Sequence, residues 1–239
     1  MRTFVFLHVE LEPERSPLFY PTVLVRSLRV CQKDSVIIQC SDRQSPEVPG
    51  VDRVARFDGD SSKLMTFRLS CFSRLSQIGP AVYLDTDMIC VRPLDPAAIL
   101  GDANIALCKR EYEVNHLLSK ELRSLLPEYT DRTLGEIWPY VACCSVTQGP
   151  EFWIDCAAEL ATLNTKFQDW YGDQEAMRNI ATLGKYKIRN LPETIYGNLD
   201  AIGKRAAAGT SPTPPRLIHF KGLRGKRHMA EYAKKIGLI

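Results

Sequence analysis

Apolar positions along this chain fall into two alternating patterns, continuous runs and runs at helical spacing. The continuous runs predict strands at residues 3–9, 35–40, 51–57, 81–91 and 103–109. Between them, residues 18–30 and 63–77 have the spacing of helices. Strands that alternate with helices of this length are typical of right-handed βαβ units and a mostly parallel sheet. Residues 1–110 therefore predict a nucleotide-binding type of α/β half.

The pattern in residues 111–239 is more mixed. It predicts strands at 140–146, 186–191 and 217–220 and helices at 115–126, 151–163 and 174–183. Small residues and prolines predict a loop at 203–215, and a terminal helix has an apolar face at Met229, Tyr232, Ala233 and Ile236. No internal repeat and no long linker divides the chain. We expect one α/β domain over residues 1–239, with helices on both faces of the sheet.

Composition and charge exclude several classes of protein. Hydrophobic residues make up 45% and charged residues 25% of the 239 positions, which excludes a disordered chain, a collagen-like repeat, a coiled coil and a polytopic membrane protein. The 31 basic and 28 acidic residues leave a net charge of +3, too small to indicate a nucleic-acid binder. The apolar run 4–7 ends at His8 and Glu10, well short of a signal-peptide core. We therefore expect a cytoplasmic protein.

Eight cysteines show no CxxC spacing, and most lie in apolar runs such as 36–40 and 103–108. Free cysteine behaves as a small buried hydrophobe. We expect reduced thiols in the core, and neither zinc ligands nor disulfides.

Two carboxylates, Asp85 and Asp87, interrupt the apolar run 81–91. On an extended chain both side chains point to the same side, and two ionised carboxylates so close are costly to bury unless a cation lies between them. In an open α/β sheet, ligands bind outside the carboxyl ends of the strands, and Mg²⁺ or Mn²⁺ takes one or two carboxylates plus substrate phosphates. The pattern predicts a divalent-metal site. A solvated turn or a capped helix start is the alternative.

A second pattern lies near the C-terminus, where His219 ends a predicted strand. The turn that follows combines glycines with cations, namely Lys221, Gly222, Arg224, Gly225, Lys226 and Arg227. Glycine lets a backbone approach a phosphate, and cations neutralise it. If the fold brings His219 to the two aspartates, the three side chains suit an octahedral metal, and the imidazole favours Mn²⁺ over Mg²⁺. The alternative is a solvated basic turn before the last helix.

Arg68 lies in the middle of an apolar helical stripe formed with Leu64, Cys71 and Leu75. A guanidinium there needs carboxylates or a phosphate to offset its desolvation, unless it reaches water at the edge of the helix. Farther along, Asp173-Gln174-Glu175 opens a predicted helix, where an aspartate also serves as an N-cap.

These motifs, in this order, resemble the GT-A fold glycosyltransferases, and most closely glycosyltransferase family 8, which includes glycogenin and bacterial lipopolysaccharide galactosyltransferases. The matching segments are Phe67-Arg68-Leu69, Tyr83-Leu84-Asp85-Thr86-Asp87, Asp173-Gln174-Glu175 and His219-Phe220-Lys221-Gly222. The resemblance covers nearly the whole chain. It implies a single GT-A domain, with a nucleotide-binding half over 1–110 and an acceptor and sugar half over 111–239 that ends in the basic turn and helix.

The resemblance also implies an activity, namely Mn²⁺-dependent transfer of a hexose from a nucleotide diphosphosugar, usually a UDP-sugar, to an acceptor hydroxyl with retention. Asp85, Asp87 and His219 would bind the metal, and Asp85 would also bind the ribose side of the donor. Asp173 would face the sugar hydroxyls and Gln174 the anomeric side. The remaining donor contacts, at arginine, lysine and glycine positions, would be Arg68, Lys221, Gly222 and Lys226, with Arg224 as the rival of Lys226.

The chain departs from the family pattern in one strand. Where the family tends to have Asn-x-Gly, residues 140–146 read Tyr-Val-Ala-Cys-Cys-Ser-Val, which puts the acceptor contact and the activity in doubt. A catalytically inactive nucleotide-sugar binding protein of the same fold is therefore the main alternative. A phosphatase of the haloacid-dehalogenase type would need its DxD early in the chain, and a sugar nucleotidylyltransferase would need a glycine-rich N-terminal loop, which residues 4–9 lack.

The acceptor would be a saccharide or a lipid-linked saccharide. The segment 224–239 combines five cations with an apolar face, so it would either rest on an anionic membrane that presents such an acceptor or pack on the body of the protein.

Overall fold

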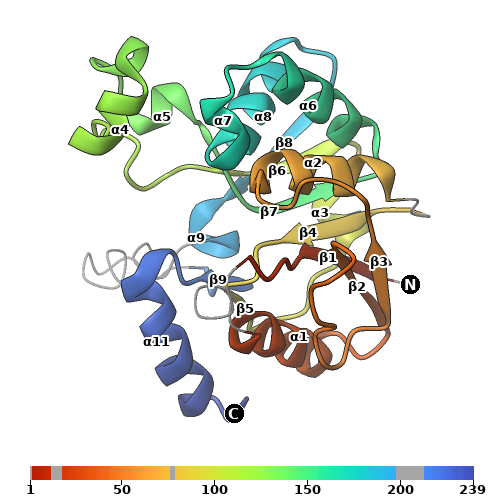
Figure 1. Cartoon of the computed structure of the whole chain (residues 1–239). Coiled ribbons are helices and arrows are strands. Elements are labelled where there is room, and N and C mark those ends of the chain that lie inside the picture. Colours follow the sequence, from red (N-terminus) through yellow and green to blue (C-terminus); the bar gives the residue numbers. More distant parts are fainter. Residues whose placement is uncertain (1, 12–17, 76–78, 198–212) are drawn as a thin grey trace.

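A computed structural model describes residues 2–11, 18–75, 79–197 and 213–239. Its centre is a seven-stranded sheet with the strand order β3-β2-β1-β4-β7-β6-β8 (Figure 1). The strands are β1 (Arg2–Leu7), β2 (Ser35–Ser41), β3 (Arg53–Arg56), β4 (Ala81–Leu84), β6 (Ile105–Lys109), β7 (Tyr140–Thr147) and β8 (Ile188–Pro192). Neighbours pair in parallel except at β7, which is antiparallel to both β4 and β6. The predicted mostly parallel sheet is confirmed.

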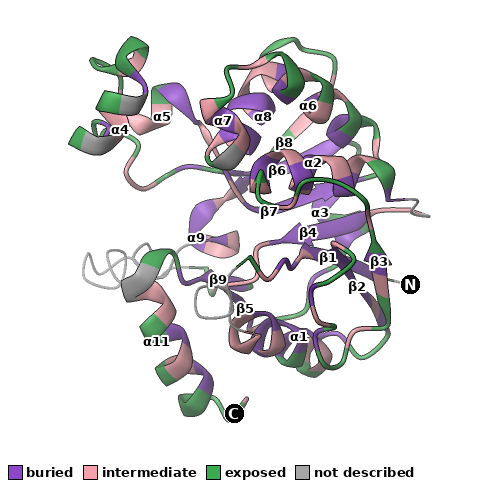
Figure 2. Cartoon of the chain, in the orientation of Figure 1, coloured by how far each residue is buried: buried purple, intermediate pink, exposed green. Residues whose placement is uncertain are grey.

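Helices cover both faces of this sheet, and the alternation of side chains along β1 shows how. Val5 packs into the cluster that contains residues of α2 (Leu64–Arg74), α6 (Glu151–Thr162) and α8 (Gly172–Thr182). Phe4 and Phe6 point to the opposite face, into the cluster with α1 (Phe19–Cys31) and α3 (Pro96–Leu100). Figure 2 shows the buried sheet between these layers. A strand buried on both faces reads as a continuous apolar run, as the sequence indicated.

A second, two-stranded sheet joins the middle of the chain to its C-terminal part. Strand β5 (Met88–Cys90) pairs antiparallel with β9 (Leu217–His219), and Met88 lies opposite His219. Helix α11 (Gly222–Lys235) follows and packs its Met229 and Ala233, both fully buried, on these strands. Met229, Tyr232 and Ala233 of the predicted apolar face therefore pack on the body of the protein, as in the packed-helix alternative, whereas Ile236 lies after the helix and is exposed.

The predicted strand 81–91 is wrong as one element. It ends at Leu84, a turn holds Thr86 and Asp87, and β5 begins at Met88 in the other sheet. The backbone N–H of Asp85 still donates to the carbonyl of Cys143, 3.0 Å away, so the break follows directly on the last ladder bond to β7. The two aspartates therefore converge through a turn and not through strand alternation.

The predicted helix 115–126 is shorter in the structure. Leu117 forms an isolated bridge with Thr133, and the side chain of Ser119 accepts a hydrogen bond from the N–H of Leu122. Since this cap fixes the helix start, α4 covers only Lys120–Leu125. Short elements not predicted from the sequence follow and include η1 (Pro127–Tyr129), α5 (Leu134–Ile137), α7 (Lys166–Asp169) and α9 (Glu193–Tyr196).

The predicted basic turn after His219 is also wrong, because α11 begins at Gly222 and includes Arg224, Gly225 and Lys226. Most of the predicted loop 203–215 lies outside the described residues. All eight cysteines are free, and all but Cys31 are buried, as predicted. Within the described part of the chain, no helix combines the length and the apolar character needed to cross a membrane.

Candidate functional site

Asp85, Asp87 and His219 lie together at the carboxyl end of β4. The Nε2 atom of His219 is 3.2 Å from Oδ1 of Asp87 and 3.7 Å from Oδ2 of Asp85. One ligand atom from each residue can be chosen so that all three lie within 4.8 Å of one another. The pairing of β5 with β9 produces this convergence, since it sets His219 opposite Met88, the residue after Asp87.

The charges of this group depend on one another. Burial would raise the pKa of the Asp87 carboxyl, but His219 and Lys226 outweigh burial, and the pKa lies below its usual range. Burial would lower the pKa of His219, but the Asp87 carboxylate raises it well above its usual range. In the absence of a metal the proton therefore resides on the imidazole. Two carboxylates and an imidazole fit a divalent cation, which would take the place of that proton.

Arg68 joins the acidic group to a third carboxylate. Its Nη2 is 2.8 Å from Oδ1 of Asp85 and its Nη1 is 3.1 Å from Oδ2 of Asp173, while Nη2 also donates to the carbonyl of Ala142 at 2.8 Å. The Arg68 side chain is only 12% exposed, so the alternative in which it reaches water at the edge of the helix is wrong. The carboxylate partners that the apolar stripe requires are present.

Asp173 lies inside helix α8 and does not cap it. The helix begins at Gly172, after Tyr171 in a left-handed conformation with φ of 63°. Burial raises the pKa of Asp173 even though Arg68 opposes that rise. Gln174, the next residue, accepts a hydrogen bond at its Oε1 from Nη2 of Arg110, 3.0 Å away. The first turn of α8 therefore places Asp173 at the guanidinium that also binds Asp85, while the Gln174 amide is held by Arg110.

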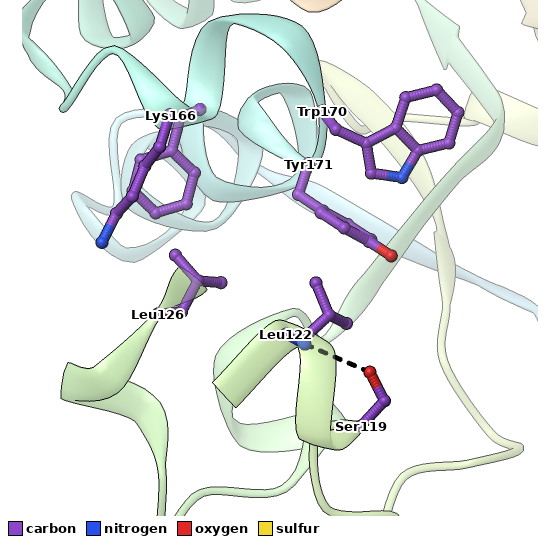
Figure 3. Close-up of a pocket in the computed structure, with 7 residues that line it drawn as sticks. Ser119, Leu122, Leu126, Lys166, Trp170 and Tyr171 are labelled. Carbon is purple, nitrogen blue, oxygen red and sulfur yellow. Dashed lines mark hydrogen bonds between the residues drawn. The ribbon is translucent and has the colours of Figure 1, made fainter. Parts of the chain in front are cut away.

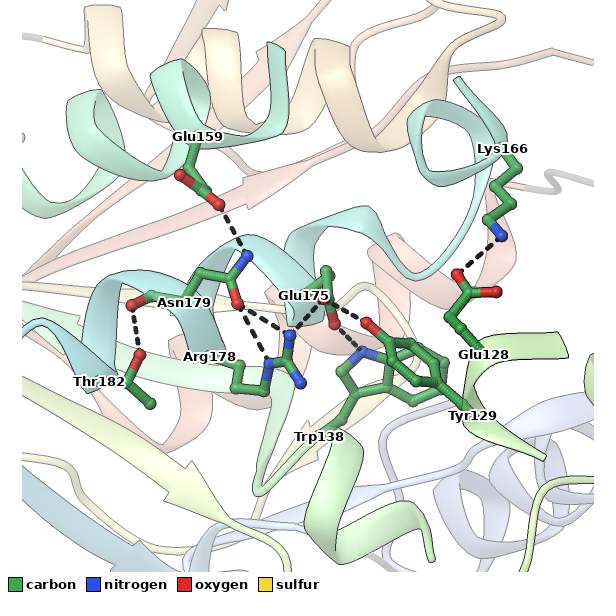
Figure 4. Close-up of polar contacts among 9 residues, drawn as sticks. All are labelled: Glu128, Tyr129, Trp138, Glu159, Lys166, Glu175, Arg178, Asn179 and Thr182. Carbon is green, nitrogen blue, oxygen red and sulfur yellow. Dashed lines mark hydrogen bonds and ion pairs between the residues drawn. The ribbon is translucent and has the colours of Figure 1, made fainter. Parts of the chain in front are cut away.

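The third residue of that motif, Glu175, lies in a network of polar contacts of its own (Figure 4). Its carboxylate accepts hydrogen bonds from the Tyr129 hydroxyl at 2.7 Å and from the Trp138 indole N–H at 3.0 Å, and it pairs with Arg178. Both ring donors belong to the segment 111–139 between β6 and β7. Glu175 therefore fastens this segment to the helix that holds Asp173.

Of the basic residues after His219, Lys221 precedes α11 and Lys226 lies within it. The amine of Lys226 is 3.9 Å from Oδ2 of Asp87, so this lysine lies at the acidic group. Lys221 lies farther out, with its amine 3.5 Å from Oε2 of Glu113. The side chain of Arg224 lies outside the described residues.

The positions of Gly222 and Gly225 each favour glycine, but for different structural reasons. Gly222 has a φ of 72°, which favours glycine, and open space where a side chain would be. A side chain at Gly225 would instead lie 2.6 Å from the backbone of Phe220. Gly225 therefore serves the packing of α11 and not the approach of a phosphate.

Sequence reasoning missed Arg110 and Glu113. Arg110 follows β6 directly and is buried, with Nε donating to the carbonyl of Trp138 at 2.9 Å. Glu113, a non-glycine residue with φ of 59°, lies 3.5 Å from both Arg110 and Lys221. Since β4 and β6 are both antiparallel to β7, their carboxyl ends share one edge of the sheet. The rule that led to Asp85 therefore applied equally to the residue after β6.

Among the comparisons with known proteins, the one with solved structures supports the fold. No protein-family model matches the sequence, and no curated protein is similar to it in sequence. Among solved structures, the galactosyltransferase LgtC in complex with donor and acceptor sugar analogues has a TM-score of 0.61 at 11% identity, covering 98% of this chain and 95% of that chain. The glycosyltransferase GlyE of Streptococcus pneumoniae has a TM-score of 0.58 at 16% identity, covering 98% and 61%.

A third similar structure is the bifunctional glycosyltransferase WbbM, with a TM-score of 0.56 at 15% identity over 92% of this chain and 46% of that chain. All three are glycosyltransferases. The chain therefore has the GT-A fold that its motifs predicted, and it resembles the family 8 galactosyltransferase LgtC over nearly its whole length.

Proposed function

We propose that this protein is a metal-dependent glycosyltransferase that moves a hexose from a nucleotide diphosphosugar, a UDP-hexose, to a hydroxyl of a saccharide acceptor with retention of the anomeric configuration. The observation that supports this most is the convergence of Asp85, Asp87 and His219 at the carboxyl end of β4, in a chain with the GT-A fold. That end of an open α/β sheet is where ligands bind.

Asp85, Asp87 and His219 would hold a divalent cation, with Mn²⁺ favoured over Mg²⁺ because one ligand is an imidazole. When bound, such a cation supplies charge stabilisation to the oxygens of a diphosphate leaving group. Such oxygens could reach the site from solvent, because the Asp85 side chain is 26% exposed. The metal site therefore suits a ligand that brings oxygen atoms of its own.

The start of α11 would contribute a second positive charge at the diphosphate. A helix N-terminus has a partial positive charge, and the first turn of α11 contains no acidic residue. Lys226 lies in this part of the helix with its amine near Asp87, and Lys221 precedes it. As the sugar leaves, charge grows on the diphosphate, so these cations would stabilise the transition state more than the ground state.

Asp173 and Gln174 would orient the sugar of the donor. Arg68 binds both Asp85 and Asp173, so the position of the metal ligand and that of the sugar contact are linked through one guanidinium. Arg110 holds the amide oxygen of Gln174, which leaves the amide N–H₂ group of Gln174 to donate. We assign no covalent intermediate.

Metal-dependent release of UDP from a UDP-hexose tests this function. The wild type with Mn²⁺ should release UDP, and Asp87→Asn should lose nearly all of that turnover while it still folds. Asp102→Asn, on an exposed aspartate near β6, is the matched control and should keep full turnover. Near-normal turnover by Asp87→Asn would exclude the metal assignment. Binding of UDP with Mn²⁺ but no turnover with any acceptor would instead support the inactive binding protein.

A further inference from the structure

One cysteine of this chain is accessible to reagents in solution. All eight cysteines lie within the described residues, and seven of them are buried. The pocket between α4, α7 and the start of α8 (Figure 3) is lined by leucines, aromatic residues, Ser119 and Lys166, so it exposes no thiol. Cys31, the last residue of α1, is partly exposed. A reagent dissolved in water therefore reaches Cys31 first.

Helix α1 holds this thiol against Cys90 in β5, the strand beside it (Figure 1). Ser27 and Cys31 lie about one turn apart, on the same face of α1. The Ser27 hydroxyl accepts a hydrogen bond from the N–H of Cys90 at 2.9 Å, and the Cys31 thiol donates to the carbonyl of Cys90 at 3.3 Å. Because both backbone groups of Cys90 bind α1, the fold itself keeps the two cysteines together.

The two thiols also contact each other, and this contact makes them chemically unequal. The hydrogen bond from the Cys90 thiol lowers the pKa of Cys31 to about 7, although burial opposes that change. The same hydrogen bond and burial raise the pKa of Cys90. The thiolate is the nucleophilic form of cysteine. The pair therefore combines an accessible nucleophile with a neighbouring thiol, as redox-sensitive cysteines with a resolving partner do.

A second pair of neighbouring thiols, Cys108 and Cys143, lacks these properties. Both side chains are fully buried. The hydrogen bond with Cys143 would lower the pKa of Cys108, but burial raises it, and the same bond together with burial raises the pKa of Cys143 well above its usual range. Buried, protonated thiols are inert. Proximity of two thiols is therefore common to both pairs, while access and ionisation distinguish Cys31 and Cys90.

We propose that Cys31 and Cys90 form a redox-sensitive site, which closes to a disulfide in the presence of a peroxide and reopens when a small thiol reduces it. This inference goes beyond the proposed transferase function and does not depend on it.

Oxidation takes place in two steps. The Cys31 thiolate attacks one oxygen of hydrogen peroxide, the O–O bond breaks and hydroxide leaves, so Cys31 becomes a sulfenic acid. The Cys90 sulfur then attacks the Cys31 sulfur, the S–O bond breaks, and the Cys90 proton and the leaving hydroxyl form water. The two thiols lose two electrons in total, and the peroxide and the two thiol protons become two molecules of water.

The disulfide would act on the elements that carry the acidic group. It closes the loop from residue 31 to residue 90, which contains Arg68, Asp85 and Asp87. Cross-linking a long loop restricts the unfolded chain and so stabilises the folded one. Strand β5 begins directly after Asp87 and pairs with β9, which ends at His219. The bond would therefore fasten to α1 the strand that brings the two parts of the acidic group together.

Counting free thiols tests this site. The full chain is treated with a small molar excess of hydrogen peroxide and unfolded, and its free thiols are alkylated and counted by mass spectrometry. The wild type should fall from eight thiols to six, with Cys31 and Cys90 joined in one pair of peptides, and dithiothreitol should restore all eight. The midpoint of thermal unfolding of the oxidised protein should rise by roughly 5 to 10 °C.

Three variants separate this pair from the other cysteines. Cys31→Ser should keep all of its thiols, and Cys90→Ala should stop at a sulfenic acid on Cys31, which dimedone traps. Cys156→Ala, at a buried cysteine on the other face of the sheet, is the matched control and should still lose two thiols. The proposal is wrong if the wild type keeps eight thiols, if Cys31→Ser loses two, if peroxide joins Cys31 of two chains, or if the thermal midpoint does not rise.

Discussion

At the scale of single residues, Arg68 links two carboxylates, because its guanidinium lies between those of Asp85 and Asp173. Removing one partner of a buried ion pair leaves uncompensated charge and costs about 3 to 5 kcal/mol. Arg68→Met, which keeps much of the volume, should lower the free energy of unfolding in urea by that amount. Arg43→Met, which breaks an exposed pair with Asp58, should leave the urea midpoint nearly unchanged. Equal midpoints for the two variants would contradict the pairing.

His8 makes stability depend on pH in a predictable direction. Burial lowers the pKa of His8 below its usual value, although Glu10 and Asp42 oppose that change, and its buried Nε2 has no hydrogen-bond partner. Below its usual pKa, His8 therefore binds a proton more readily in the unfolded chain than in the folded chain. This stability is present above about pH 6.5, the usual histidine value, and is lost as the pH falls from there toward the lowered pKa of the folded state.

Urea unfolding as a function of pH measures this effect. The wild type should lose stability as the pH falls below about 6.5, the usual histidine value, and His8→Gln should lose less over the same interval. His116→Gln, at an exposed histidine, should follow the wild type. Identical pH profiles for His8→Gln and the wild type would show that another group is responsible.

How far single residues can be predicted depends on whether their context is local. The need of Arg68 for carboxylates follows from its neighbours in one helix, and the structure supplies both partners. The ion pair of Glu113 with Lys221 joins residues far apart in the chain, and the left-handed backbone at Glu113 is not indicated by any local sequence pattern. Such a contact becomes visible only once the strand order is known.

At the scale of elements, Gly225 sets the position of α11. A side chain at this glycine would lie 2.6 Å from the backbone of Phe220, so Gly225→Ala must push the helix outward. Overpacking of this kind costs about 1 to 3 kcal/mol. The variant should also weaken Mn²⁺-dependent UDP binding, because Lys226 moves with the helix away from Asp87. Glu231→Ala, at an exposed position of α11, should change neither quantity.

The segment 111–139 depends on Glu175 for its attachment to α8. Glu175→Leu would leave the Trp138 indole N–H buried without an acceptor, at a cost of about 1 to 3 kcal/mol. Hydrogen exchange should then accelerate in residues 120–137 and stay slow in β1. Glu128→Leu, which breaks a more exposed ion pair on η1 with Lys166, is the matched control and should leave exchange unchanged. Uniform acceleration throughout the chain would contradict a local attachment.

Elements were predicted correctly where apolar periodicity determines their extent, and less well where a turn or a side-chain cap sets their ends. The strands of the central sheet and the longer helices have strong apolar patterns, and the structure reproduces them within a few residues. The run 81–91 is apolar on both sides of Asp85-Thr86-Asp87, and the apolar pattern alone does not distinguish polar residues within one strand from a turn between two strands. Similarly, the apolar spacing of 115–126 continues past Ser119, whose cap sets the true start of α4.

At the scale of the whole molecule, the candidate site forms because the C-terminal part of the chain folds back against the end of β4. Residues before 90 supply Asp85, Asp87 and Arg68, and residues after 170 supply Asp173 and His219. The sequence predicted this set through the order of motifs in related folds, while its own local patterns left the meeting of the two halves open. The register of β5 with β9, which sets Met88 opposite His219, brings the two halves together.

Calorimetric titration of UDP, with and without Mn²⁺, tests the central claim most directly, because it needs no knowledge of the acceptor. The wild type should bind UDP only when Mn²⁺ is present, and Asp87→Asn should abolish that binding while its thermal unfolding stays cooperative. Metal-dependent binding that Asp87→Asn retains in full, or no UDP binding by the wild type with Mn²⁺, would contradict a metal and donor site at Asp85, Asp87 and His219.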